Sequence, residues 1–131
     1  MNIIQVTCGI ILKDGKVLVA QRSETMSLPL KWEFPGGKMI EGESEEECLK
    51  RELLEELNIS IVIKDRLSTS TFNYGNFTIA LIPFLVEYVE GEIILHEHRQ
   101  MGWFARRELE ALDWALADIP ILEEFLRITS L

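Results

Sequence analysis

The chain has 131 residues, of which 47% are hydrophobic and 27% are charged, as expected for one globular domain over residues 1–131. Acidic residues outnumber basic ones by 22 to 13, the formal net charge is -9, and the densest basic cluster is only Arg106-Arg107. This balance argues against polymeric nucleic acid and anionic membranes as partners, and leaves a small polyanion that metal ions bridge to acidic groups.

The N-terminal part of the chain predicts a β-hairpin. Residues 3–12 are largely apolar and β-branched, which is typical of a strand buried on both faces. Asp14-Gly15 follows, and this pair between two apolar runs predicts a tight turn into a second strand over residues 16–22. The next expected elements are a loop over 23–31, a short strand over 32–34 and a tight turn at Pro35-Gly36-Gly37.

The remaining elements alternate between strands and helices, which predicts a mixed α/β (α+β) domain whose helices cover a sheet. Asp118 precedes the last helix, and Pro120 lies in that helix's first turn. The expected elements are a helix over 44–57, a strand over 59–63, a hairpin of 72–77 with 78–89, a short extended segment over 93–95, a segment from Trp103 that leads to a helix near 107–112, and a helix over 119–128.

Cys8 and Cys48 are the only cysteines in the sequence, and neither has the spacing of a metal or redox motif. The N-terminal sequence has no basic stretch before a long apolar run, so it does not resemble a signal peptide. No apolar run approaches the roughly 20 residues that span a bilayer. We therefore expect a cytoplasmic protein with two buried thiols.

The helix over 44–57 carries the most informative pattern. Ser44 and Glu47 have the spacing of a capping box, and Asn58 suits the left-handed end of a helix. At 100° per residue, three glutamates gather on one arc while three leucines form the neighbouring flank. These are Glu52, Glu55 and Glu56, and Leu49, Leu53 and Leu57. Clustered carboxylates favour a hard cation such as Mg²⁺, although a solvated acidic face is the alternative from charge pattern alone.

Residues 36–59, GGKMIEGESEEECLKRELLEELNI, match the Nudix box. In this motif glycine, five residues and glutamate precede seven residues and then Arg-Glu-aliphatic-any-Glu-Glu-any-Gly-aliphatic. The matching positions are Gly37, Glu43, Arg51, Glu52, Leu53, Glu55, Glu56 and Ile59. Asn58 replaces the family's glycine, and both residue types accept positive φ. The chain thus resembles the Nudix hydrolases of the MutT type along nearly its whole length.

This resemblance implies a Nudix α/β/α sandwich with a mixed central sheet, in a monomer or homodimer. It also implies a Mg²⁺ or Mn²⁺ site with five ligands, and zinc is not expected at such a site because it prefers nitrogen and sulfur ligands. The ligands would be the carbonyl of Gly36 and the carboxylates of Glu52, Glu55, Glu56 and Glu97. Arg51 would orient the carboxylates by ion pairing, and Glu43 would assist the site.

By the same resemblance, water attacks the β-phosphorus of a nucleoside triphosphate and releases a nucleoside monophosphate and pyrophosphate. Glu52 is the first choice for the general base that accepts the proton of this water, and Glu97 is the second. Glu97 lies between His96 and His98, two histidines that could contact phosphate but are expected to be solvated in a loop. A surface carboxylate is the alternative for Glu97.

Three positions match those that recognise the nucleotide in MutT-like enzymes. Arg22 would meet sugar or phosphate, Phe34 would line the base pocket, and Asp118 stands where 8-oxo-guanine-specific enzymes carry asparagine. An ionised aspartate only accepts hydrogen bonds, which suits N4 of cytosine, whereas a protonated one could donate to an oxidised guanine. A cap for the last helix is the simpler alternative for Asp118. Phe77 or Tyr74 could stack on the base, with ordinary packing as the default.

The segments ALADIPILEEF and HEHRQMGW resemble the CTP pyrophosphohydrolase branch of the family, which acts on CTP, dCTP and modified cytosine nucleotides. We therefore expect a cytosine nucleotide as the substrate. An 8-oxo-dGTP sanitising hydrolase is the first alternative, and a catalytically inactive nucleotide-binding module is the second. The inactive module is disfavoured because all four box glutamates are present.

Overall fold

The structure is a computed structural model and describes residues 2–129. Within this range, eight strands form one mixed sheet whose central path runs β3-β2-β1-β7-β5. The strands are β1 (Ile3–Lys13), β2 (Lys16–Gln21), β3 (Trp32–Glu33), β4 (Gly36–Lys38), β5 (Ser60–Arg66), β6 (Ser70–Asn73), β7 (Thr78–Glu90) and β8 (Gln100–Ala105). β1 and β7 pair in parallel, and the other pairs of strands are antiparallel.

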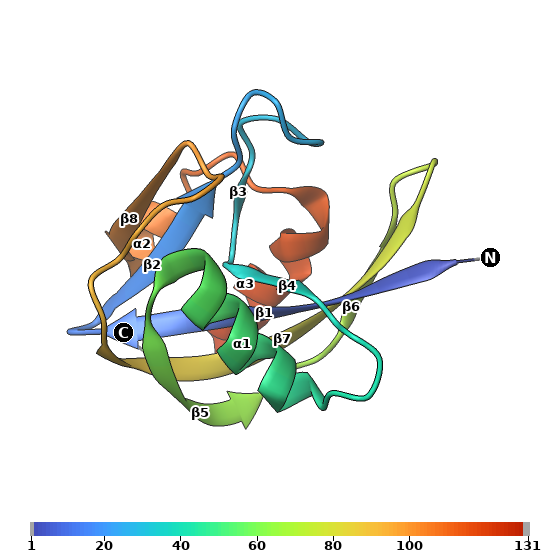
Figure 1. Cartoon of the computed structure of the whole chain (residues 1–131). Coiled ribbons are helices and arrows are strands. Elements are labelled where there is room, and N and C mark those ends of the chain that lie inside the picture. The colour runs from blue at the N-terminus through green and yellow to red at the C-terminus, as the bar shows by residue number, and fades with distance from the viewer. Residues whose placement is uncertain (1, 130–131) are drawn as a thin grey trace.

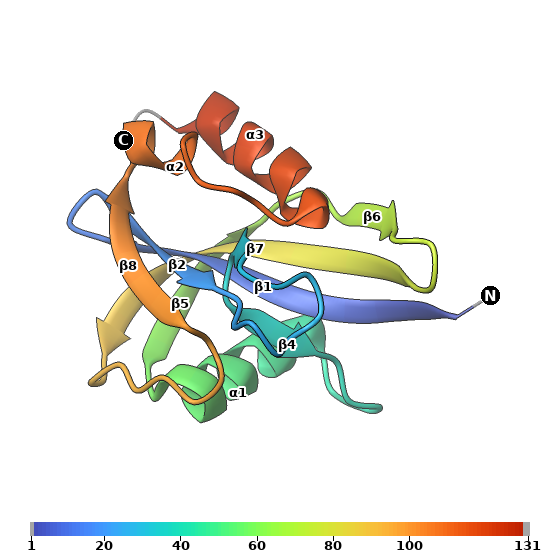
Figure 2. The same cartoon turned by 90° about the horizontal axis from the view of Figure 1, so that it is seen from above.

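Helices cover both faces of the sheet (Figure 1). Figure 2 shows α1 (Glu45–Leu57) on one face, and α2 (Arg106–Leu109) and α3 (Ile119–Ile128) on the other. A 3₁₀ turn, η1 (Leu116–Asp118), leads directly into α3. The expected α/β/α sandwich is thereby confirmed. Among residues 2–129, no helix is long and apolar enough to cross a membrane.

The central strand β1 separates two hydrophobic clusters. Residues 7–11 are all buried, and Ile10 packs into the cluster under α3 while Ile11 packs into the cluster under α1. This division follows from the strand geometry, because successive side chains point to opposite faces. The prediction of a strand buried on both faces is confirmed for this stretch. The turn after it is also as expected, since Asp14 and Gly15 both have positive φ.

Local signals fix the position of α1. Ser44 accepts from the backbone N–H of Glu47, whose side chain accepts from the Ser44 N–H, so the capping box is formed. Asn58 ends the helix with φ 61° and ψ 36°, the left-handed conformation expected at this position. Three leucines attach the helix to the sheet, and each is at most 1% exposed; they are Leu49, Leu53 and Leu57. The face of the helix that carries the glutamates is therefore held in a fixed orientation to the sheet.

Several sequence-based boundaries differ from the structure. The turn predicted at residues 35–37 was wrong, because Gly36–Lys38 form β4 and pair with β1. Residues 93–95 belong to no strand, and the N–H of Ile94 instead donates to the carbonyl of Leu57 at the end of α1. β8 begins at Gln100, three residues before the expected start at Trp103. The helix expected near 107–112 spans only Arg106–Leu109.

Candidate active site

A cavity of about 610 Å³ brings together residues from both ends of the chain. Its size falls in the range of small-molecule sites, which is roughly 300–1,000 Å³. Its lining includes residues of β4 and α1, and residues near Phe34 and η1. Eleven of the residues singled out from the sequence line it; these are Arg22, Phe34, Gly36, Gly37, Glu52, Glu56, Tyr74, Phe77, Glu97, His98 and Asp118. Glu43, Arg51 and Glu55 lie outside the lining.

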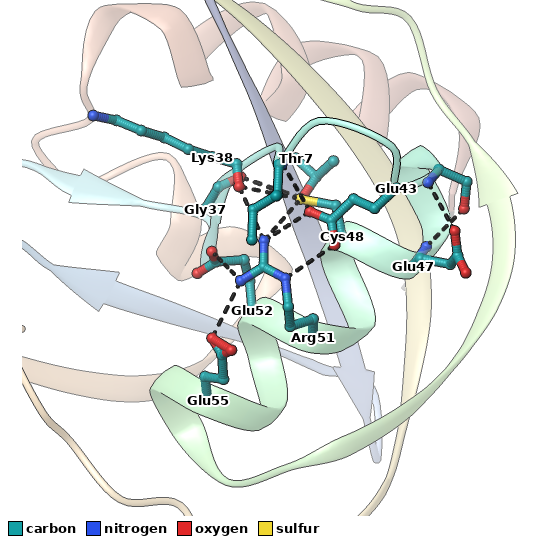
Figure 3. A network of polar contacts seen from close by, with 11 residues as sticks. Thr7, Gly37, Lys38, Glu43, Glu47, Cys48, Arg51, Glu52 and Glu55 are labelled. Carbon is teal, nitrogen blue, oxygen red and sulfur yellow. Dashed lines mark hydrogen bonds and ion pairs between the residues drawn. The ribbon is translucent and has the colours of Figure 1, made fainter.

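Arg51 connects three of the four carboxylates of the box (Figure 3). Its guanidinium donates twice to Glu43, at 3.0 and 2.7 Å, and its Nη1 donates to Glu52 at 2.9 Å and to Glu55 at 3.2 Å. A further bond of 3.2 Å reaches the carbonyl of Lys38 on β4. The bonds from Arg51 lower the pKa of Glu43 to about 2. Arg51 thus forms ion pairs with Glu43, Glu52 and Glu55 at once.

Two glycines allow β4 to approach both β1 and α1 closely. A Cβ atom on Gly36 would lie 1.9 Å from the backbone oxygen of Thr7 on β1. A Cβ atom on Gly37 would lie 2.1 Å from Oε2 of Glu52. The glycines are thus required for contact rather than for a turn. The Pro35 carbonyl accepts from the N–H of Gly9 on β1, and the N–H of Met39 donates to the carbonyl of Gln5 on β1. Because the carbonyls of successive residues in a strand point in opposite directions, the Gly36 carbonyl points away from β1.

The three clustered glutamates of α1 have different surroundings. Glu52 is 15% exposed, and burial raises its pKa although Arg51 opposes this shift. Glu56 also lines the cavity, whereas Glu55 is 57% exposed and faces solvent. The cavity therefore offers carboxylate and carbonyl oxygens, which are the donors that Mg²⁺ prefers. In the described part of the chain, no three His, Cys, Asp or Glu side chains are already gathered around one point.

Glu33 was missed by the sequence analysis, although it lies at the centre of a polar chain along the cavity. Its Oε1 accepts from Nη1 of Arg22 at 2.8 Å, and its Oε2 lies 2.7 Å from Nε2 of His98. Arg22 also donates to the carbonyl and hydroxyl of Ser27. The expectation of a solvated His98 was wrong, because its side chain is only 10% exposed; His96 is exposed as expected. An acidic residue between Trp32 and Phe34 was the available sequence signal.

Asp118 also lines the cavity and is only 4% exposed. Its Oδ2 accepts from the N–H of Phe34 at 2.9 Å, and it makes no side-chain bond to the start of α3, so the role of helix cap was wrong. Burial, and then the charge of Glu33, raise the pKa of Asp118 well above its ordinary value. Burial thus works against ionisation of this carboxyl, and both alternatives from the sequence, an accepting and a donating Asp118, are retained.

Aromatic side chains line the cavity near Asp118. The rings of Tyr74 and Phe77 stack with their centroids 5.2 Å apart, and both line the cavity. Phe34 packs against Trp114 at 4.7 Å, with only 3% of its surface exposed. The hydroxyl of Tyr74 accepts from the N–H of Ala117 at 2.9 Å, which ties the β6–β7 hairpin to the turn that carries Asp118. These aromatic side chains form an apolar part of the cavity lining, the aromatic wall, next to the carboxyl group of Asp118.

Similar proteins include a CTP pyrophosphohydrolase of Escherichia coli K12, which is 35% identical over 128 residues and covers 98% of this chain and 95% of the relative. An 8-oxo-dGTP diphosphatase of Haemophilus influenzae is 33% identical over 129 residues, with 98% and 95% covered. Among solved structures, the solution structure of the ORF135 protein of E. coli superposes with a TM-score of 0.85 at 35% identity, covering 98% of this chain and 91% of that one.

The sequence model of the NUDIX domain matches residues 3–125, a range that contains the sheet, the box helix and the cavity. The fold and the box carboxylates agree with this match. The chain therefore belongs to the NUDIX domain family and is a Nudix hydrolase of the MutT type.

Proposed function

We propose that the chain is a divalent-metal-dependent enzyme that splits a nucleoside triphosphate into a nucleoside monophosphate and pyrophosphate. CTP, dCTP and modified cytosine nucleotides are its proposed substrates. One observation carries this proposal: the lining of a single cavity contains carboxylates of α1 and, from other elements, Asp118 with aromatic side chains. A triphosphate and a base need these two environments at once.

The triphosphate belongs at the side of Glu52 and Glu56. The metal ligands we propose are the Gly36 carbonyl with Glu52, Glu55, Glu56 and Glu97, and the metal is Mg²⁺ or Mn²⁺. Bound there, divalent ions neutralise the triphosphate and polarise its phosphoryl oxygens. Glu55 must turn from solvent toward the cavity to take part, since its carboxylate now bonds to Arg51 at its exposed side.

Glu52 is the proposed general base for the attacking water. Its side chain faces the cavity, and its orientation is set by Nη1 of Arg51 on one side and by close contact with Gly37 on the other. A partly buried carboxylate with a raised pKa is a stronger base than a solvated one. Arg51 and Glu43 act as positioning residues, and Glu97 is the second candidate for the base.

The base of the nucleotide belongs between Phe34, Phe77 and Asp118. Arg22 reaches the cavity from the end of β2, and we assign it to the sugar or a phosphate. For a cytosine, the carboxyl of Asp118 would accept from the N4 amine. The similarity to the E. coli CTP pyrophosphohydrolase over 98% of the chain supports this substrate class.

The second candidate substrate is 8-oxo-dGTP. It is favoured by the burial of Asp118, because a protonated carboxyl can donate to the oxygen of an oxidised guanine, as an asparagine amide does. The similarity to 8-oxo-dGTP diphosphatases points the same way. We rank it second because Asp118 can also accept.

Pyrophosphate release from a panel of triphosphates tests the proposal. The panel contains CTP, dCTP, 5-methyl-dCTP, 8-oxo-dGTP, dGTP and ATP with excess Mg²⁺, and each has an EDTA control. We expect EDTA-sensitive turnover with the cytosine nucleotides ranked first. Faster turnover of 8-oxo-dGTP than of the cytosine nucleotides would identify 8-oxo-dGTP, the second candidate, as the substrate. Absence of pyrophosphate from every triphosphate would overturn the proposed reaction.

We also propose that residues 1–131 act as one domain, as a monomer or homodimer in the cytoplasm, with no polymeric nucleic acid or membrane as partner. The net charge of -9 supports this choice of partners, because polyanions are repelled unless metal ions bridge them.

A further inference from the structure

The carboxylate of Glu33 accepts hydrogen bonds from two side chains in distant parts of the chain, Arg22 and His98. Its Oε1 receives Arg22 at 2.8 Å, and its Oε2 receives Nε2 of His98 at 2.7 Å. Because a carboxylate only accepts, Nε2 carries the hydrogen in this bond. Side-chain exposures of 20% for Glu33 and 10% for His98 show that the contact is shielded from solvent.

The backbone of Glu33 is held in place by the central sheet. It lies on β3, where it pairs with Ala20 of β2, and its neighbour Phe34 is bonded to Asp118. The ring of His98 is thus bonded to a strand of the central sheet. In contrast, the segment that carries His98 has no regular secondary structure between β7 and β8.

This irregular segment carries Glu97 into the cavity. Its early part is bonded to the end of α1, through Asn58 to the carbonyl of Glu92 and through Ile94 to Leu57. Its end is bonded to β2 through the N–H of Arg99. Among residues 94–100, all of which the structure describes, His98 is the one whose side chain is not exposed.

We propose that His98 is a positioning residue that holds Glu97 at the cavity through its bond to Glu33. This inference deepens the proposed function and rests on the role proposed there for Glu97. The bond restrains the residue next to Glu97, so the Glu97 carboxylate starts from a fixed place on the cavity edge. The same carboxylate of Glu33 holds Arg22, so the triphosphate side and the nucleoside side of the cavity share one support.

Removal of the His98 ring should release Glu97 without unfolding the domain. Loss of a partner that orients a metal-binding side chain typically costs about 10- to 100-fold in activity or metal affinity. We therefore expect His98→Ala to lower kcat by about 10- to 100-fold. His98→Gln should restore much of the loss, because the glutamine amide can donate to Glu33 from a similar position.

A matched control is present two residues away. His96 flanks Glu97 on its other side and is exposed, so His96→Ala removes the same side chain from the same segment. We expect His96→Ala to keep kcat within about twofold, as is usual for surface substitutions away from specific contacts. Equal losses in His96→Ala and His98→Ala would overturn the proposal.

A double-mutant cycle with Glu97→Ala separates positioning from other roles. If His98 acts through Glu97, the double variant loses no more activity than Glu97→Ala alone. If His98 acts on the nucleotide through Glu33 and Arg22, the two losses add and fall mainly on KM, which overturns the proposal. Glu97→Ala with wild-type activity would also overturn it, while inactive Glu52→Gln would leave the proposed function standing.

Mn²⁺ binding supplies a measurement that needs no turnover. Titration of the protein with Mn²⁺, with free Mn²⁺ followed by electron paramagnetic resonance, gives the affinity of each variant. We expect His98→Ala and Glu97→Ala to weaken binding alike, and His96→Ala to bind as the wild type does. Wild-type Mn²⁺ affinity in His98→Ala beside weakened affinity in Glu97→Ala would overturn the positioning role. Melting temperatures show that each variant is folded.

Discussion

The backbone N–H of Phe34 donates to Oδ2 of Asp118 at 2.9 Å, joining two residues that are 84 positions apart. The bond connects the residue that precedes the box to the start of the last helix. The carboxyl also lines the cavity, and no buried side-chain oxygen in the described residues lacks a partner. Oδ2 is thus engaged within the protein, and Oδ1 is the oxygen that would meet the nucleotide base in the proposed function.

Asp118→Asn should change the ranking of substrates. Asparagine keeps an oxygen for the Phe34 N–H, so the fold should persist, but its amide presents a fixed donor and acceptor to the base. We expect kcat/KM for cytosine nucleotides relative to 8-oxo-dGTP to fall by about 10- to 100-fold, the value of about one specific base contact. Parallel assays of CTP, dCTP and 8-oxo-dGTP measure this ratio.

Asp113→Asn is the matched control for this change. Asp113 has a side chain that is 71% exposed, pairs with Lys31 and lies outside the cavity lining. Its substitution should leave the substrate ratio unchanged. An unchanged ratio in Asp118→Asn as well would restrict Asp118 to supporting Phe34.

The stability of the protein should depend on the state of Asp118. Burial raises its pKa well above the ordinary value, so the folded protein retains this proton after the unfolded chain has released it. The wild type therefore loses stability as the pH rises from about 4, the ordinary pKa of aspartate, toward the raised pKa. Asp118→Asn lacks this loss, so its melting temperature should rise relative to the wild type over the same range.

Thermal melts of both proteins between pH 4 and neutrality, in EDTA to remove metal effects, provide the measurement. The diagnostic quantity is the difference between the two melting temperatures at each pH, because groups far from Asp118 titrate equally in both proteins. A difference that stays constant with pH would mean that Asp118 is ionised in the folded state.

The accuracy of the sequence-based predictions depended on how local each signal was. The helix α1 was predicted with both of its ends, because Ser44, Glu47 and Asn58 act within one turn of its ends. The clustering of Glu52, Glu55 and Glu56 followed from spacing along that same helix, and their assignment as metal ligands came from the family resemblance. The sandwich itself came from family resemblance and not from local patterns.

Features that depend on distant partners were missed. The strand at Gly36–Lys38 was read as a turn, because glycines adjacent to a proline usually signal one and the partner β1 lies about 30 residues away. The contact of Glu33 with His98 spans 65 positions, so no spacing rule could reveal it. The burial of Asp118 is likewise a property of the packed cavity, and its effect on the carboxyl could not be taken from the sequence.

Glu52→Gln should abolish turnover while the protein stays folded. Glutamine can still accept the 2.9 Å bond from Arg51, but it cannot take a proton from water. Loss of a general base typically costs about 10²- to 10⁴-fold in rate. Glu46→Gln is the control, because Glu46 lies on the same helix and is exposed. Pyrophosphate release with Mg²⁺ measures both, and near wild-type turnover in Glu52→Gln would transfer the role of base to Glu97.

Gly36→Ala should lower the stability of the fold, whereas Gly37→Ala should lower the rate of catalysis. A methyl group on Gly36 would meet the backbone oxygen of Thr7 at 1.9 Å and Cα of Cys8 at 2.7 Å, in the buried centre of β1. The backbone there cannot move without disturbing the sheet, so we expect a loss of about 1–3 kcal/mol or more in the free energy of unfolding. Chemical denaturation measures this loss.

A methyl group on Gly37 would instead meet the carboxylate of Glu52, with Oε2 at 2.1 Å. Since a flexible side chain can move aside, Gly37→Ala should remain folded while Glu52 is displaced from its place beside the cavity. A displacement on the order of 1 Å can cost about 10²-fold in rate, so kcat should fall by that factor with a near wild-type denaturation midpoint. If Gly37→Ala kept full turnover, catalysis would not require Glu52 in its present position. If it unfolded as readily as Gly36→Ala, the glycine would serve the sheet rather than the carboxylate.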